Sequence, residues 1–174
     1  MDTPKKPGDA ADSRHDYLDE VRRHDGLIRK VSRLYAHTPE DRLDLAQEIR
    51  LQLWRAWTGY TGEAKRTTWM YRVALNTALT FQRREGRRPV GQPLENLDVA
   101  DPASRDGKQR DQRQALIQAL GRLEPGERAL ALLWLEECSY KEIASISGLS
   151  VNVVGVRLHR VRERLKVLLG GGAR

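Results

Sequence analysis

Two groups of basic side chains carry the clearest chemistry in this sequence. Residues 65–88 contain seven Lys and Arg against one acid, and residues 151–166 contain five against one. Side chains of this kind bind nucleic-acid phosphates, and Arg also reads guanine in the major groove. A separate segment, residues 40–48, contains four acids and one Arg. Two basic surfaces with a distinct acidic one predict a protein that binds one polyanion at two places.

The patterns on which catalysis and cofactor binding usually depend are not found. The sequence has neither a glycine-rich phosphate loop nor a GxSxG nucleophile turn. Its four histidines are scattered and its single cysteine is Cys138, so we expect neither a zinc site nor an internal disulfide. No apolar run is long enough to span a membrane. We therefore expect no catalytic residue, no metal, no cofactor and no membrane contact by the chain itself.

The spacing of apolar residues predicts helices throughout and no strand. Three amphipathic stripes lie in the first half of the chain: Leu27, Ile28, Val31, Leu34 and Tyr35; Leu45, Ile49, Leu53 and Trp57; Trp69, Val73, Thr77 and Phe81. Thr38 and Pro39 are typical of a helix start, and the glycines of residues 58–64 indicate a loop. We expect Trp57 and Trp69 in the core, while the stripe leaves open whether Trp54 packs or serves an interface.

A change of composition divides the chain. Residues 89–110 are rich in Pro, Gly and Asp and predict a flexible linker, and residues 1–12 predict a disordered tail. Ser139 and Glu142 form a capping-box pattern, Gly148 suits a helix end, and Ser150 can cap the next helix. Two helices with this connection indicate a helix-turn-helix. We expect an all-α protein with two small helical domains, residues 13–88 and 111–170, the second containing the helix-turn-helix.

Six segments resemble those of one known family. Residues 44–48 read DLAQE, 53–57 LWRAW and 68–78 TWMYRVALNTA; further on, 123–128 read LEPGER, 139–144 SYKEIA and 157–165 RLHRVRERL. In this order they resemble bacterial RNA polymerase sigma factors of the extracytoplasmic-function (ECF) group, over about residues 14–169. The resemblance implies a cytoplasmic transcription initiation factor, not an enzyme, with a region 2-like domain followed by a region 4-like domain.

The resemblance also assigns roles to residues of the first domain. It implies that core RNA polymerase, through its β′ and β subunits, is bound by Asp44, Gln47, Glu48 and Trp54. It implies that the promoter element near the start site, the −10 element, is bound by Tyr60, Thr61, Gly62, Lys65, Arg66, Arg72, Asn76, Arg83 and Arg84. The loop before residue 66 is expected to capture a flipped base, and Arg72 and Asn76 to contact the exposed strand.

The second domain is expected to place its last helix in the major groove of the upstream, or −35, element. The residues implied are Ser150, Asn152, Val153, Arg157, Arg160 and Arg164. Asn152 suits adenine and Arg157 suits guanine, whereas Arg160 and Arg164 suit phosphates. The family often has Lys and Ser where this chain has Gly155 and Val156, so base reading at this turn is expected to be weaker or different.

The expected partners are therefore core RNA polymerase, promoter DNA and an inhibitory anti-sigma factor, the last from the resemblance alone. A stand-alone helix-turn-helix regulator is the main alternative, and it would bind duplex DNA unaided without an acidic docking helix. An interaction protein whose basic helices meet an acidic partner is another, and salt-insensitive binding would favour it. An RNA-acting enzyme is the most distant, because no acid–base or metal constellation accompanies the basic residues.

Overall fold

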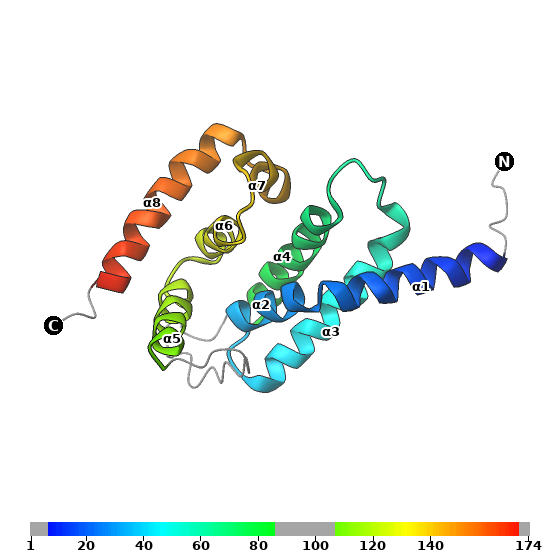
Figure 1. The fold of residues 1–174 in the computed structure, drawn as a ribbon, viewed down its shortest axis with the longest axis horizontal. Helices are drawn as coiled ribbons and strands as arrows, with labels where there is room; N and C mark the ends of the chain where they lie inside the picture. Colours follow the sequence, from blue (N-terminus) through cyan, green and yellow to red (C-terminus); the bar gives the residue numbers. More distant parts are fainter. Residues whose placement is uncertain (1–6, 86–106, 171–174) are drawn as a thin grey trace.

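The computed structural model describes residues 7–85 and 107–170, which form helices joined by short turns (Figure 1). Over these ranges no strand occurs, which confirms the all-α prediction. The elements of the first domain are α1 (Pro7–Arg23), α2 (Asp25–Tyr35), α3 (Pro39–Ala56), the 3-10 turn η1 (Trp57–Gly59) and α4 (Arg66–Glu85). Those of the second are α5 (Gly107–Gly121), α6 (Pro125–Leu135), α7 (Tyr140–Ser147) and α8 (Val151–Gly170).

In the first domain, α2, α3 and α4 pack around the predicted apolar stripes. Ile28, Leu45, Ile49 and Leu53 are fully buried, as their spacing predicted. The Thr38 hydroxyl accepts a hydrogen bond from the Asp41 amide at 3.0 Å, and Pro39 occupies the first turn of α3. The predicted start of this helix is thereby confirmed, and the helix holds its acidic residues on the outer surface.

Two boundaries differ from the sequence expectation. α1 begins at Pro7 and α5 at Gly107, so part of the expected tail and of the expected linker is helical. Proline suits the first position of a helix, because its missing N–H would have no partner there. The remainder of both segments, residues 1–6 and 89–106, lies outside the described residues, as do residues 86–88 of the expected first domain.

The second domain ends in the predicted helix-turn-helix. Ser139 and Glu142 form the reciprocal capping box at the start of α7, and Gly148 ends that helix in the left-handed conformation with φ of 71°. The Ser150 hydroxyl accepts from the Val153 amide at 3.3 Å, which caps α8. Val154 is fully buried between the two helices, so the turn is held by packing as well as by caps.

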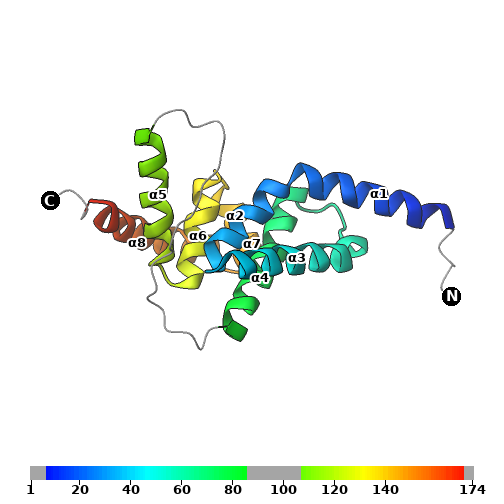
Figure 2. The ribbon, with the colours of Figure 1, turned by 90° about the horizontal axis from the view of Figure 1, so that it is seen from below.

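The two domains pack against each other. α4 contacts α6 and α7, and α2 contacts α5, while α1 and α8 lie at opposite ends of the molecule (Figures 1 and 2). Arg128 lies at this joint with 4% exposure, and its guanidinium donates to the Leu34 carbonyl of the first domain at 2.7 Å. The Tyr35 hydroxyl returns a hydrogen bond to the Pro125 carbonyl at 2.8 Å.

Candidate functional site

The outer face of α3 combines acidic and apolar side chains. Asp44 and Gln47 are exposed, while Glu48 is half-buried and accepts a hydrogen bond from Arg84 at 3.2 Å. Trp54 is 42% exposed, and its ring packs edge-on against the Tyr17 ring, with the two ring centres 5.0 Å apart. These α3 positions follow helical spacing, so they share one face. A helix face with this mixture suits docking to another helix.

Sequence reasoning missed two apolar residues on this face. Leu43 is 67% exposed and Leu51 is 46% exposed. The only signal available was their position outside the buried stripe of Leu45, Ile49 and Leu53. Together with Trp54 they give the outer face of α3 exposed apolar area.

The loop before α4 is organised around stacked rings. The Arg66 guanidinium lies 5.0 Å from the Trp57 ring centre and 5.1 Å from that of Tyr60, and it pairs with Glu20 at 3.5 Å. The Trp69 ring packs against the Tyr60 ring, with the two ring centres 5.4 Å apart. Arg66 and Tyr60 therefore form a fixed, half-buried platform, which uses cation–π contacts as well as packing.

The tip of this loop is open. Thr61 and Gly62 are exposed, and Gly62 has a positive φ of 81°, which favours glycine. The Tyr60 hydroxyl donates to the Ala64 carbonyl at 2.6 Å, which closes the loop on itself. The tip is therefore presented by a rigid base.

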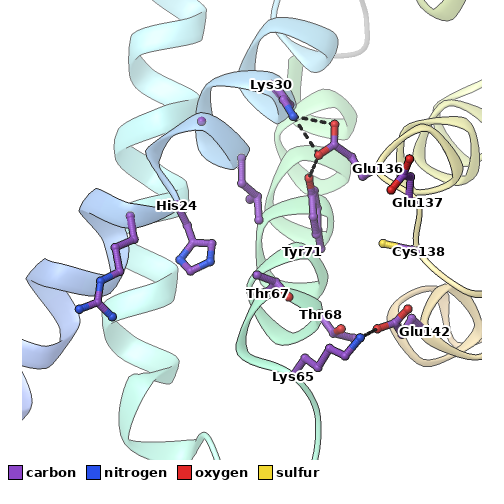
Figure 3. Close-up of a pocket in the computed structure, with 13 residues that line it drawn as sticks. His24, Lys30, Lys65, Thr67, Thr68, Tyr71, Glu136, Glu137, Cys138 and Glu142 are labelled. Carbon is purple, nitrogen blue, oxygen red and sulfur yellow. Dashed lines mark hydrogen bonds and ion pairs between the residues drawn. The ribbon is translucent and has the colours of Figure 1, made fainter.

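Two residues expected at the −10 element contact the second domain instead. Lys65 pairs with Glu142 at 2.8 Å (Figure 3), and Arg72 donates to the carbonyl and hydroxyl of Ser145 at 2.5 and 2.9 Å. Both acceptors belong to α7, the first helix of the helix-turn-helix. In this conformation α7 thus engages two basic side chains of the first domain, although both remain exposed.

A cleft of about 380 Å³ lies in this joint, between α2, α4 and the α6–α7 turn (Figure 3). Glu136 accepts from the Lys30 ammonium at 2.6 Å and from the Tyr71 hydroxyl at 3.0 Å. Burial raises the pKa of Tyr71, and the Glu136 carboxylate raises it further, so this hydroxyl stays protonated and donates.

Glu142 and Cys138 line the same cleft. Hydrogen bonds from Lys65 and then Ser139 lower the pKa of Glu142 to about 2, so it is ionised at neutral pH. Burial raises the pKa of the Cys138 thiol, and the nearby carboxylates raise it further. A thiol of raised pKa is a poor nucleophile at neutral pH, because little of it is thiolate.

The remaining residues expected at the −10 element lie along α4. Asn76 and Arg83 are exposed and lie four and eleven residues after Arg72, so the three share one face of the helix. Arg84 is exposed and reaches back to Glu48 on α3. The structure thus joins Glu48, which is expected to bind core polymerase, and Arg84, which is expected to bind DNA, in one ion pair.

The expected −35 residues are exposed and lie on α8, except Ser150, which caps its start. Asn152, Arg157 and Arg160 are exposed, and within the described ranges no hydrogen bond or ion pair engages the two arginines. Arg164 pairs with Glu127 of α6 at 2.6 Å. Gly155 faces α7: a Cβ there would stand 3.6 Å from the Tyr140 ring, an ordinary contact, so no close approach requires the glycine.

Two negative findings apply to the described residues. No group of three or more His, Cys, Asp and Glu there could hold a metal ion. No helix within 7–85 and 107–170 is both long and apolar enough to cross a membrane.

Comparisons with known proteins match both domains. The Sigma-70 region 2 family matches residues 20–88, and the Sigma-70 region 4 family matches residues 113–165. Neither is a catalytic family. The ECF RNA polymerase sigma-E factor of Haemophilus influenzae is 30% identical over 152 residues, covering 80% of this chain and 77% of that protein. The chain belongs to the ECF family of sigma factors.

Two further relatives show how much of a longer protein the chain matches and which fold it shares. The ECF RNA polymerase sigma factor SigG of Mycobacterium tuberculosis is 32% identical over 74% of this chain, but the match spans only 42% of SigG. The sigma factor RpoE of Bartonella quintana, solved with the anti-sigma factor NepR, has a TM-score of 0.67 at 20% identity. That alignment covers 89% of this chain and 97% of RpoE, and it shows a shared fold.

Proposed function

We propose that this chain binds core RNA polymerase through its β′ and β subunits in the cytoplasm, directs it to specific promoters and assists DNA melting. The observation that carries the proposal is the ordered match of sigma region 2 and region 4 to two helical domains, each with its own basic surface. A protein that only binds duplex DNA needs one such domain, and the acidic face of α3 would have no use in it.

In this proposal the face of α3 docks on the polymerase. Asp44 and Gln47 supply exposed polar groups, and Leu43, Leu51 and Trp54 supply exposed apolar area around them. Aromatic and apolar anchors carry most of the energy of a protein interface, while surrounding charges set orientation. Glu48 contributes through its ion pair with Arg84, which fixes both side chains.

The loop tip and the ring platform bind the −10 element. Thr61 and Gly62 receive a base that has left the duplex, and Tyr60 and Arg66 form the surface against which it packs. Stacking on a fixed aromatic surface contributes about 1–3 kcal/mol per base, enough to offset much of the cost of unstacking. Lys65, Arg72, Asn76, Arg83 and Arg84 hold the single strand along α4.

The −35 element is bound by α8. Ser150 caps α8, and the first turns of the helix present Asn152, Val153, Arg157 and Arg160 to solvent. This is the part of a recognition helix that reaches base edges. Arg164 lies further along the helix near the phosphate backbone. Two modest DNA contacts then act together, because both domains belong to one chain held by one polymerase.

Separation of the domains precedes full DNA binding. Lys65 and Arg72 are engaged by Glu142 and Ser145, so α7 and the −10 strand compete for the same side chains. An anti-sigma factor is a further proposed partner. RpoE of Bartonella quintana, which shares this fold, was solved with such a protein, and a partner that favours the packed arrangement would inhibit initiation.

Run-off transcription with purified core polymerase tests the proposal. Core plus this chain should give a specific transcript, and core alone should not; equal activity without the chain refutes the function.

The double change Asp44→Lys and Glu48→Lys should abolish co-purification with core. Asp44→Lys alone isolates the docking face, since Glu48 also pairs with Arg84. Asp111→Lys, an exposed change of equal charge on α5, is the control and should bind normally.

A further inference from the structure

The first two turns of α8 present an apolar pair beside two arginines. Val153 is 39% exposed and Val156 is 55% exposed. Together with Arg157 and Arg160 they follow spacings of three, four and seven residues, so all four share one face of the helix. That face points away from the domain core, which α8 enters through Val154, Leu158, Val161 and Leu165.

Polar base reading by this face is restricted. Gly155 offers no side chain, and the Tyr140 ring lies beside it. Val156 cannot donate or accept a hydrogen bond, and neither can Val153. Any sequence selectivity that these two positions add must therefore come from apolar contact.

The major groove offers one apolar group on its base edges, the C5 methyl of thymine. Arg157 and Arg160 provide the positive charge that brings this face against DNA, since neither is paired with a described residue. We propose that Val153 and Val156 contact thymine methyl groups in the −35 element and make it selective for thymine. The inference rests on the proposed docking of α8 in the major groove.

The spacing of the two valines limits where the thymines lie. Three residues of helix rise by about 4.5 Å, and neighbouring base pairs are about 3.4 Å apart. The two side chains therefore meet the same base pair or adjacent ones. Burying one methyl group changes affinity by about fourfold, so each contact adds modest but measurable selectivity.

Replacing deoxythymidine by deoxyuridine tests this directly, because it removes the C5 methyl and leaves the base pairing intact. The holoenzyme of full chain and core polymerase first selects promoters from a library randomised in the upstream element. Each thymine of the selected element, on either strand, is then changed singly to deoxyuridine. We expect one position or two adjacent ones to lose about fourfold in affinity.

Variants connect that loss to the side chains. In Val156→Ala or Val153→Ala holoenzyme, the deoxyuridine effect should disappear at the position that the missing side chain contacted. Val167→Ala is the matched control, because Val167 is 73% exposed near the far end of α8, and it should keep the full effect. Alanine is the better helix former, so α8 remains intact in each variant.

Three results would overturn the inference: a selected element without thymine, full tolerance of deoxyuridine at every position, or an undiminished effect in both valine variants. Failure of the proposed function looks different, because no core-dependent selection of any promoter would then occur. That outcome would remove the inference together with the function on which it rests.

Discussion

Replacing Arg128 by Met is expected to lower the free energy of unfolding by about 3–5 kcal/mol. The side chain donates to the Leu120, Gly121 and Leu123 carbonyls at 3.1, 2.8 and 3.1 Å, in addition to Leu34. Its guanidinium also lies 5.2 Å from the Tyr35 ring centre. One buried cation therefore satisfies the end of α5 and the end of α2.

The magnitude follows from what the change leaves behind. The carbonyls at a helix end have no partner within the helix, and they carry the negative end of its dipole. Each of the four would lose a charged donor at about 1 kcal/mol or more. Methionine recovers part of the loss by apolar burial and by removing a desolvated charge. Burial already lowers the pKa of Arg128, which reflects that desolvation.

Denaturant unfolding followed by circular dichroism measures the effect. Arg122→Met is the control, since Arg122 is exposed and should change stability by less than about 0.5 kcal/mol. Arg128→Lys should fall between the two, because an ammonium cannot reach four carbonyls in a planar fork. A loss below about 1 kcal/mol in Arg128→Met would refute the capping argument.

Three smaller predictions concern α7 and the joint. The pKa of Glu142 is lowered to about 2 in the folded protein. The ionised carboxylate therefore stabilises the fold fully above the pKa of Glu142 in the unfolded chain, and this stabilisation is lost as the pH falls through the folded pKa. Glu142→Gln should remove the part of the acid-unfolding curve that comes from this loss. Gly148→Ala should cost about 1 kcal/mol in denaturant unfolding, because φ is 71° there. Tyr71→Phe should lower stability by about 1 kcal/mol, since Glu136 loses a donor, and thermal unfolding measures it.

Each of these has its own control. An unchanged acid-unfolding curve in Glu142→Gln would contradict the assigned linkage. Gly126→Ala, at an ordinary helical position with open space around it, should be neutral or stabilising. Tyr140→Phe removes an exposed hydroxyl and should leave the melting temperature unchanged, whereas an equal effect of both tyrosine changes would argue against a special role for Glu136.

Local signals in the sequence predicted the local structure. The cap at Thr38, the capping box at Ser139 and the left-handed Gly148 each depend on neighbours within four residues, and the structure confirms all three. The buried stripe of α3 followed equally from its spacing. Such features are fixed by backbone hydrogen bonding and helix periodicity, which the sequence displays directly.

Contacts between the domains were not predictable in the same way. Lys65 meets Glu142 and Arg72 meets Ser145 across more than seventy residues, and no short-range pattern encodes either pair. In the sequence Arg128 is only the last residue of the segment LEPGER, and nothing near it indicates that it is buried at the joint and donates to the Leu34 carbonyl. The roles assigned to the DNA-facing and polymerase-facing residues stay predictions.

The joint between the domains combines the buried contacts of Arg128 with partly solvated ion pairs, and the two kinds of contact respond differently to salt. Ion pairs of this kind contribute about 0–1 kcal/mol each and weaken as ionic strength rises. The Lys65–Glu142 and Lys30–Glu136 pairs belong to this type. Added salt should therefore weaken these two ion pairs, whereas the buried hydrogen bond from Arg128 to the Leu34 carbonyl is screened much less.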